Sequence, residues 1–450
     1  VSYQGNKMGL EGHRFFSKNQ KINDLWQEIM SSKDKTKSDL LVQKRVSHIY
    51  YLNKFFDYPV SLNFKTIKNL GFVNTVVAFF SYLKSKIFKK EETNLENFYI
   101  NRFGKKLYSM FFKGYTEKLW GRDPKDISAE WGSQRVKGIS ITKVITAYLK
   151  KLFHIKDKKI ETSFIDQFLY PKYGPGEMWE QLASEITAMG GNIILNAKVI
   201  ALKQSNHRIT KVVYNQDGKS ISKDVDILIS SMPIKDLIES LNQVPKKITK
   251  IAKDLPYRDF MTVGILTKKV NFEGKDKIDD TWIYIQEENI KMGRLQIFNN
   301  WSSYLVKDKN CYSLGLEYFC DEGDKLWNLT DDEFYEFAVK ELEKMNIVHT
   351  SDIVLHHVER VKKAYPAYFD SYQYIDDVKD YLDTIVNLYC IGRNGQHHYN
   401  NMDHSMLTAI EAINNIINNK DTKENIWNVN TEKEYMEETI HEKNSSKNKK

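Results

Sequence analysis

The chain has 450 residues, long enough for two or three hydrophobic cores. Its net charge of +8 comes from 67 basic and 59 acidic residues, with much of the excess in the last residues, which look solvated rather than like a nucleic-acid arm. Cys311, Cys320 and Cys390 are not spaced as a disulfide framework or a zinc site, which argues against both and favours a reducing, cytoplasmic compartment.

The first part of the chain reads as a short α/β segment followed by helices. Apolar residues at helical spacing predict a helix over residues 22–30, and alternating runs on both sides of Asn53 predict a hairpin. The two strands of this hairpin are expected at residues 45–51 and 54–59. Helical patterns then dominate residues 64–152.

The segment 71–88 is the best candidate for contact with a membrane. Asn74, Lys84 and Lys86 interrupt it, and its apolar run is too short to cross a bilayer. We therefore expect a helix packed on the body of the protein, with a helix that faces a membrane surface as the alternative.

The rest of the chain alternates strands with a few helices. Helices are expected at residues 177–189 and 331–345, the second with a capping-type start. Residues 216–219 have the composition of a hairpin turn. The expected strands are residues 192–202, 209–215, 221–230, 261–268, 281–286, 294–299, 312–319, 353–360 and 385–390. From about residue 418 onward the composition predicts a polar, solvated tail.

Residues 391–405 carry the clearest chemical pattern. Glycines, Arg393 and a run of Asn, Asp, His and Ser lie between a buried strand and an amphipathic helix expected over residues 406–417. A glycine-rich turn before a helix can direct backbone N–H groups at an anion, and an arginine there adds a bidentate phosphate partner. This predicts a nucleotide or cofactor loop; the alternative is an ordinary capped helix after an edge strand.

Six blocks, in order along the chain, carry a family resemblance. They are residues 12–17, 55–59, 101–104 together with 115–121, 170–179, 282–284 and 391–405. Up to about residue 419 the chain resembles the flavin-dependent group that joins UDP-galactopyranose mutases, protoporphyrinogen oxidases and flavin amine oxidases. The resemblance implies a mixed α/β fold with a Rossmann-like FAD-binding domain that is truncated at its N-terminus, a helical insertion and an antiparallel-sheet substrate domain.

We expect the chain to divide into six parts. They are the remainder of the FAD-binding domain with the hairpin (1–63), the helical insertion (64–160), FAD-binding strands and a helix (161–255), the substrate domain (256–370), a C-terminal FAD-binding segment (371–419) and the polar tail (420–450).

The resemblance implies FAD as cofactor, with NAD(P)H as a candidate reductant. The family's Gly-x-Gly-x-x-Gly unit for the pyrophosphate is not found, so we expect either a truncated product or a chain that has lost its first βαβ turn. The flavin end is better matched, although Glu11 stands where the family usually has a glycine. The cofactor-binding residues implied are Gly12, His13, Gly392, Asn401, Asp403, His404 and Ser405.

Two arginines match the pair that clamps the diphosphate of a UDP-sugar in the mutases. The resemblance assigns Arg294 and Arg393 to this clamp and places His13 at the flavin edge, which makes these three the candidate catalytic residues. Ser61 and Thr116 stand where mutases carry amides, which weakens the case for uracil as the base. The aromatic residues implied in substrate binding are Tyr58, Trp120, Tyr284, Tyr365 and Tyr399.

Three hypotheses for function follow. The first is a flavoenzyme that acts on a nucleotide-diphosphate sugar in polysaccharide or glycoconjugate synthesis. The second is an FAD-dependent oxidase or dehydrogenase of the protoporphyrinogen oxidase or amine oxidase type. The third is a truncated, non-catalytic remnant, suggested by the missing glycine-rich unit and by Glu11. In the first two the expected partner is a small molecule and not a nucleic acid, and the sequence predicts no metal site and no oligomeric state.

Overall fold

The computed structural model describes residues 1–31, 40–58, 60, 64–129, 131–132 and 167–430. These residues form two compact units: unit 1 contains the described residues of 1–178 and 260–361, and unit 2 those of 179–259 and 362–432. The chain passes from one unit to the other within α8 (Pro175–Ala188), β11 (Tyr257–Thr267) and β15 (Ile353–Pro366).

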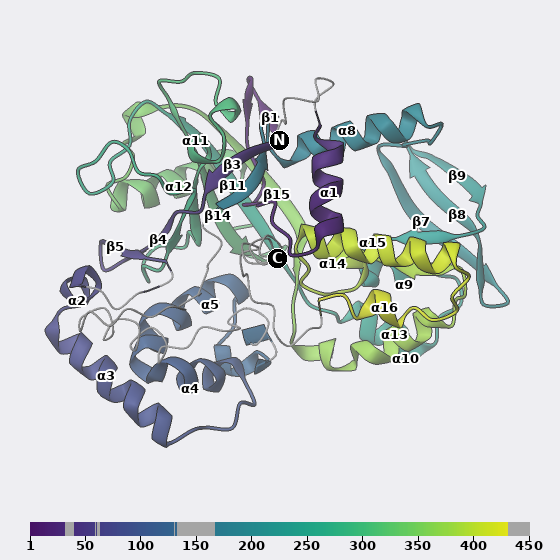
Figure 1. Cartoon of the computed structure of the whole chain (residues 1–450), viewed down its shortest axis with the longest axis horizontal. Helices are drawn as coiled ribbons and strands as arrows, with labels where there is room; N and C mark the ends of the chain where they lie inside the picture. Colours follow the sequence, from purple (N-terminus) through teal and green to yellow (C-terminus); the bar gives the residue numbers. More distant parts are fainter. Residues whose placement is uncertain (32–39, 59, 61–63, 130, 133–166, 431–450) are drawn as a thin grey trace, which may run out of the picture. The chain divides into compact units, whose positions relative to one another are not determined.

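Unit 1 is built on a seven-stranded mixed sheet of order β15-β11-β14-β13-β12-β4-β5 (Figure 1). The expected hairpin is confirmed as β4 (Ser47–Tyr51) and β5 (Lys54–Asp57), which are antiparallel, while β4 runs parallel to β12 (Trp282–Ile285). β13 (Arg294–Ile297) and β14 (Tyr312–Cys320) complete an antiparallel series with β12. β14 is buried on both faces, so most of its residues are apolar, and its polar residues Ser313 and Glu317 are buried as well.

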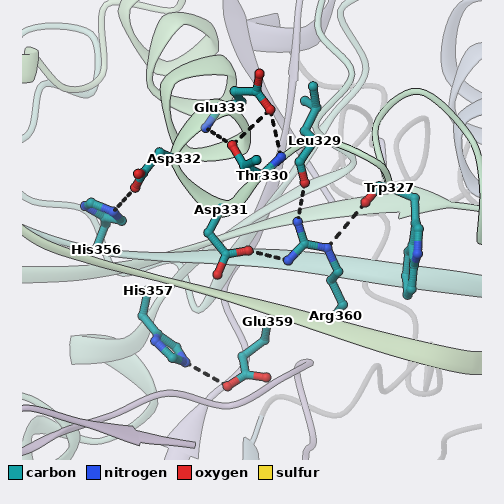
Figure 2. Close-up of polar contacts among 10 residues, drawn as sticks. All are labelled: Trp327, Leu329, Thr330, Asp331, Asp332, Glu333, His356, His357, Glu359 and Arg360. Atoms are coloured by element: carbon teal, nitrogen blue, oxygen red, sulfur yellow. Dashed lines mark hydrogen bonds and ion pairs between the residues drawn. The ribbon is translucent and has the colours of Figure 1, made fainter.

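Helix α12 (Asp331–Lys344) packs on the core of this sheet through Phe334, Ala338 and Leu342. Its expected capping start is confirmed: Glu333 N donates to Thr330 Oγ1 at 3.3 Å, and Thr330 N donates to Glu333 Oε2 at 2.8 Å (Figure 2). Arg360 of β15 ties this helix start to the sheet, because its guanidinium is paired with Asp331 and donates to the backbone carbonyl just before the cap.

The helical part of unit 1 contains α2 (Phe64–Leu70), α3 (Phe72–Ile87), α4 (Leu95–Tyr108), a π-helical turn (Ser109–Lys113) and α5 (Gly114–Trp120). This confirms the expected helices up to residue 120, and the part of that prediction over residues 133–152 lies outside the described residues. Among the described residues, no helix combines the length and apolar character that a membrane span requires.

The remaining elements of unit 1 are short. The helix predicted near residue 22 is confirmed as α1 (Gln20–Ile29), which Asn19 caps by accepting from Lys21 N. Two small antiparallel pairs join β1 (Ser2–Tyr3) to β2 (Asn6–Lys7) and β3 (Leu40–Lys44) to β6 (Gln167–Pro171). A one-turn helix, α11 (Phe298–Trp301), follows β13.

Unit 2 combines an antiparallel sheet with a parallel strand pair. The sheet contains β7 (Ala197–Ser205), β8 (Arg208–Gln216) and β9 (Lys219–Asp224), and the predicted turn is confirmed by positive φ at Asp217 and Gly218. The parallel pair joins β10 (Leu228–Ser230) to β16 (Leu388–Cys390). The other helices of this unit are α9 (Ile234–Ser240), α10 (Lys246–Lys253), α13 (Ile375–Asp383), α14 (Gly392–Gly395), α15 (Met402–Ile417) and α16 (Glu424–Trp427).

One predicted strand is two strands in the structure. Residues 221–230 divide into the end of β9 and the whole of β10, which belong to different sheets. The buried side chain of Asn387 explains the break, because its Nδ2 donates to the carbonyls of Ile209 and Asp226 at 2.8 Å. The Leu228 N–H donates to the Asn387 carbonyl, so the chain pairs with β16 from this point.

The prediction of a polar tail from about residue 418 is wrong for its described part. Residues 424–427 form α16, and Ile426 is buried in a small core with Tyr389 and Ala412. Isolated apolar residues among Asn, Asp and Lys concealed this helix in the sequence. Residues 431–450 of the expected tail lie outside the described residues.

Candidate functional site

Arg393 lies in unit 2 beside two tyrosine rings, an arrangement that we call the Arg393 cluster (Tyr365, Arg393 and Tyr399). Its guanidinium carbon is 4.5 Å from the ring centre of Tyr399 and 5.7 Å from that of Tyr365. The two rings are stacked at 5.8 Å with an angle of 11°. Arg393 Nε donates to the Asn400 carbonyl at 2.9 Å and one terminal nitrogen donates to the Ala364 carbonyl at 3.3 Å, so the guanidinium has a defined orientation.

The local backbone explains why this cluster forms. β16 ends at Cys390, and the chain turns into α14 through Gly392, whose φ of 72° is readily adopted by glycine. The Gly392 N–H donates to Thr408 Oγ1 of α15 at 2.8 Å. The Tyr399 N–H donates to the hydroxyl of Tyr368 at 2.7 Å. The turn that carries Arg393 is therefore fixed at both ends by side chains of unit 2.

Several backbone N–H groups of this turn donate within the protein. The N–H groups of Gly392 and Tyr399 donate to hydroxyls, and that of Asn401 donates to the His404 ring at 3.3 Å. Asn401 and His404 form a capping box, and α15 begins at Met402 rather than at residue 406. A capped helix therefore follows the strand, and the nucleotide or cofactor loop stays a prediction.

The polar residues expected at the cofactor lie in the first turn of α15. Asp403 and His404 are almost fully buried, with exposed fractions of 4% and 8%, and the His404 Nδ1 lies 3.7 Å from an Asp403 oxygen. Asn401 is the N-cap, and Ser405 donates its N–H to the Asn401 carbonyl. An amide, a carboxylate, an imidazole and a hydroxyl are thus present within one helical turn.

In unit 1, Arg294 lies among carboxylates, in what we call the Arg294 cluster (Glu11, Arg294 and Glu317). Arg294 and Glu317 face each other in the register of β13 and β14, and the Arg294 Nε donates to the Glu317 carboxylate. A terminal nitrogen of Arg294 donates to Glu11 Oε1 at 3.0 Å. Glu11, which replaces an expected glycine, therefore has the cationic partner that its charge requires.

Glu317 is fully buried, and this changes its protonation. The pKa of Glu317 is raised to about 7, mainly by burial. The carboxylate of Glu11 acts in the same direction, while the positive charge of Arg294 and the hydrogen bond from Gln296 act in the opposite one. The Arg294 cluster is therefore near neutral when Glu317 is protonated and carries about one negative charge when it is not.

Three tyrosines adjoin this cluster. Tyr284 lies opposite Arg294 in the register of β12 and β13, and its ring is 4.5 Å from the ring of Tyr58. Tyr115 of α5 packs edge-on against Tyr284 at 5.6 Å, and its burial raises its pKa well above the usual value, so its hydroxyl keeps its proton. The sequence did not indicate Tyr115 as a site residue, although it is the first residue of the run 115–121 that carries part of the family resemblance.

The other predicted residues of unit 1 are packed into the protein. A Cβ atom at Gly12 would lie 2.5 Å from the ring of Trp282, so this glycine is required by the tryptophan. The His13 Nδ1 lies 3.0 Å from the Glu11 carbonyl. Trp120 is 3% exposed and packs edge-on against Trp131, so base stacking on its ring would require the ring to be uncovered.

The structure thus brings the predicted residues together in two sets. Tyr58, Tyr284 and Arg294 adjoin one another in unit 1, and Tyr365, Arg393 and Tyr399 do so in unit 2. In the first set Arg294 is paired with the carboxylates of Glu11 and Glu317, and the sequence did not indicate these two residues as its partners.

Comparison with known proteins shows which proteins this chain is similar to. Residues 89–412, more than half of the chain, match the family model described as flavin-containing amine oxidoreductase. A solved structure of reduced UDP-galactopyranose mutase has a similar fold, with a TM-score of 0.78 at 20% identity over 96% of this chain and 90% of the other.

Two further structures share the fold. A protein from Exiguobacterium described as a protoporphyrinogen oxidase has a TM-score of 0.65 at 13% identity, over 91% of this chain and 88% of the other. A putrescine oxidase variant has a TM-score of 0.56 at 13% identity, over 92% of this chain and 90% of the other. At these identities the likeness concerns the fold alone.

Proposed function

Since the chain belongs to the flavin-containing amine oxidoreductase family, and is thus a flavin-dependent oxidoreductase or mutase, we propose that it binds FAD and acts on a nucleotide-diphosphate sugar in the manner of a sugar mutase. The observation that carries this proposal is the Arg393 cluster, in which a guanidinium of fixed orientation lies beside two stacked tyrosines. The fold shared with UDP-galactopyranose mutase supports it.

Arg393 would bind the diphosphate. A planar guanidinium donates two parallel hydrogen bonds to phosphate oxygens, and tyrosine hydroxyls donate to the oxygens beside them. The hydrogen bonds to the carbonyls of Asn400 and Ala364 restrict rotation of the guanidinium, so less side-chain freedom is lost when an anion binds. A positive charge held in this way also stabilises a nucleotide diphosphate as it leaves the sugar.

The residues at the start of α15 fit the proposed cofactor. The ribityl chain of a flavin carries several hydroxyl groups, and the amide, carboxylate, imidazole and hydroxyl of Asn401, Asp403, His404 and Ser405 form a donor and acceptor set suited to it. When bound, the flavin supplies the redox or nucleophilic chemistry, and the protein supplies orientation. We further propose NAD(P)H as the reductant that prepares the flavin.

Arg294 differs from Arg393 because it is paired with two carboxylates, and its proposed role depends on their protonation. An arginine between two ionised carboxylates attracts an anion poorly, because the cluster then carries a net negative charge. Protonation of Glu317 removes one of these charges. We propose that Arg294 contacts an anion only in this state, with the rings of Tyr58 and Tyr284 beside it.

One observation favours a second candidate, oxidation of an amine. Glu11 and Glu317 adjoin a group of tyrosines, and carboxylates together with aromatic faces favour a cation. This candidate predicts that putrescine or a related amine reduces the bound flavin and that UDP-galactose does not bind.

The test is calorimetric titration of the purified protein with UDP-galactose and, separately, with putrescine. We expect UDP-galactose to bind, and Arg393→Ala to weaken it by more than about tenfold, because charge-assisted hydrogen bonds contribute about 1.5–3 kcal/mol. The matched control is Arg208→Ala, which removes an exposed arginine at the start of β8 in the same unit. Equal affinity of the parent and Arg393→Ala, or binding of putrescine alone, would overturn the proposal.

A further inference from the structure

Helix α3 (Phe72–Ile87) exposes large apolar side chains along its length. Phe72, Val73 and Ile87 are between 73% and 79% exposed, and Phe80 is 63% exposed. Phe88, directly after the helix, is also exposed. A single exposed apolar residue is ordinary, but a continuous apolar surface of this kind marks an interaction site.

The packing of α3 on α4 fixes which face points outward. A Cβ atom at Gly104 of α4 would lie 2.7 Å from the backbone nitrogen of Tyr82, so the two helices touch at their backbones. The Lys106 N–H donates to Ser81 Oγ at 3.0 Å. The buried residues of α3 are Ala78, Tyr82 and Ser85.

The apolar residues therefore lie on the opposite side of the helix. The positions 72, 76, 80, 83 and 87 follow helical spacing and are all Phe, Val, Leu or Ile. A surface helix of a water-soluble protein normally turns such a stripe inward and its polar residues outward. In α3 this arrangement is inverted, and Figure 1 shows α3 at the outer side of the group formed by α2, α3, α4 and α5.

Positive charge surrounds this apolar face. Residues 64–90 contain no Asp or Glu and six lysines, all exposed: Lys65, Lys68, Lys84, Lys86, Lys89 and Lys90. Acidic residues flank this segment at Asp57, Glu91 and Glu92; of these, Asp57 lies 3.7 Å from Lys65 and Glu92 is bound to Arg102 at 2.6 Å. Lysines beside an apolar helix face are attracted to the phosphate groups of anionic lipids.

We propose that α3 binds the surface of an anionic phospholipid membrane, with its phenylalanines at the boundary of the acyl chains and its lysines among the headgroups. A second copy of the chain fits this face less well, because a symmetric interface would bring the same lysines together. The chemistry is that of peripheral binding, in agreement with the absence of a membrane-spanning helix among the described residues.

Co-sedimentation with lipid vesicles tests this proposal on the full chain. We expect binding to vesicles of phosphatidylcholine with phosphatidylglycerol, much weaker binding to phosphatidylcholine alone, and loss of binding at high salt. The double variant Phe80→Ser/Ile87→Ser should reduce binding at least about tenfold, because each change removes an apolar group from the boundary. Lys84→Glu/Lys86→Glu should reduce it similarly for the anionic vesicles.

Matched control variants test whether vesicle binding depends on α3 or on exposed apolar and basic residues in general. Met189→Ser/Leu195→Ser removes two side chains that are 78% and 74% exposed in unit 2, and Lys219→Glu/Lys223→Glu reverses two exposed lysines of β9. Both controls should bind vesicles like the parent. Absence of vesicle binding, binding that the α3 variants leave unchanged, or self-association that Phe80→Ser/Ile87→Ser abolishes would overturn the proposal, and far-ultraviolet circular dichroism checks that each variant is folded.

Discussion

Glu317 and Arg294 face each other on neighbouring strands, and the protonation of this pair should control anion binding in unit 1. The pKa of Glu317 is raised to about 7, so the carboxyl gains its proton as the pH falls through neutrality. The cluster then loses a negative charge. We expect the affinity for UDP-galactose, measured by calorimetry, to increase as the pH falls through about 7.

The variant Glu317→Gln should remove this pH dependence and bind at all pH values as the parent does below its transition. His13 lies beside Glu11, with its Nδ1 3.0 Å from the Glu11 carbonyl, so His13→Asn is the control that must keep the dependence. UDP-galactose is preferred to UDP because its diphosphate has no terminal phosphate group to titrate. An unchanged pH profile in Glu317→Gln would exclude this role for the Arg294 cluster.

At Gly12 the addition of one methyl group should lower the stability of the protein. In Gly12→Ala the new methyl group would meet the ring of Trp282, which is itself packed against Trp301 and under the guanidinium of Arg14. We expect a loss of about 1–3 kcal/mol in the free energy of unfolding, measured by urea denaturation.

The comparison for Gly12→Ala is Gly114→Ala, at a helical glycine whose added Cβ meets no atom within 4 Å. This variant should be neutral or more stable by up to about 1 kcal/mol. Equal effects of the two variants would show that Trp282 can move aside.

The site could be predicted from sequence where the family resemblance carried the information. The resemblance to the mutases indicated Arg393, Tyr365 and Tyr399, and the structure places them together. The partners of Arg294 were not foreseen, because Glu11 and Glu317 are far from it in sequence and only the register of β13 and β14 brings Glu317 to it.

At the scale of elements, the start of α12 offers a local test of stability. Thr330 and Glu333 satisfy each other's backbone N–H groups, and the hydrogen bonds with Thr330 lower the pKa of Glu333. We expect Thr330→Ala to lose about 1 kcal/mol in thermal or urea denaturation. Since the folded pKa of Glu333 is depressed, its contribution is present above its unfolded pKa and lost as the pH falls through the folded one.

The control for Thr330→Ala is Thr187→Ala, an exposed threonine within α8 whose hydroxyl donates to the Ala183 carbonyl four residues earlier. Alanine suits a helix interior at least as well, so no loss is expected there. A stability loss in Thr187→Ala as large as in Thr330→Ala would mean that capping is not the cause.

Elements with a clear period were predictable, and those decided by distant contacts were not. α1, the β4–β5 hairpin and α12 follow from apolar spacing, a turn and a cap. The division of residues 221–230 into β9 and β10 depends on Asn387, more than a hundred residues away in sequence. α16 is only four residues long, too short for a period to appear.

At the scale of the whole molecule, the sequence predicted the mixed α/β class and the family, and the structure and the family match confirm both. The two compact units were not predicted in this form. Residues 1–63, which we expected with the FAD-binding segments, lie in unit 1 with the seven-stranded sheet where described. β4 pairs with β12, which is more than two hundred residues away, and local pattern cannot reveal such pairing.

Membership of a flavoprotein family predicts that the purified protein carries a flavin. We expect the visible absorption of a flavin, released on denaturation in an amount near one per chain. In Asp403→Ala the flavin content should fall severalfold, whereas Asp217→Ala, in the β8–β9 turn, should retain it. Colourless protein that takes up no added FAD would instead support the non-catalytic remnant.

The proposed function depends most on Arg393 as the residue that binds the diphosphate of the nucleotide-sugar. A crystal structure of the protein soaked or co-crystallised with UDP-galactose tests this directly. We predict phosphate oxygens within hydrogen-bonding distance of the Arg393 guanidinium, with the hydroxyls of Tyr365 and Tyr399 beside them. A diphosphate bound elsewhere, with Arg393 still directed only at the carbonyls of Ala364 and Asn400, would contradict it.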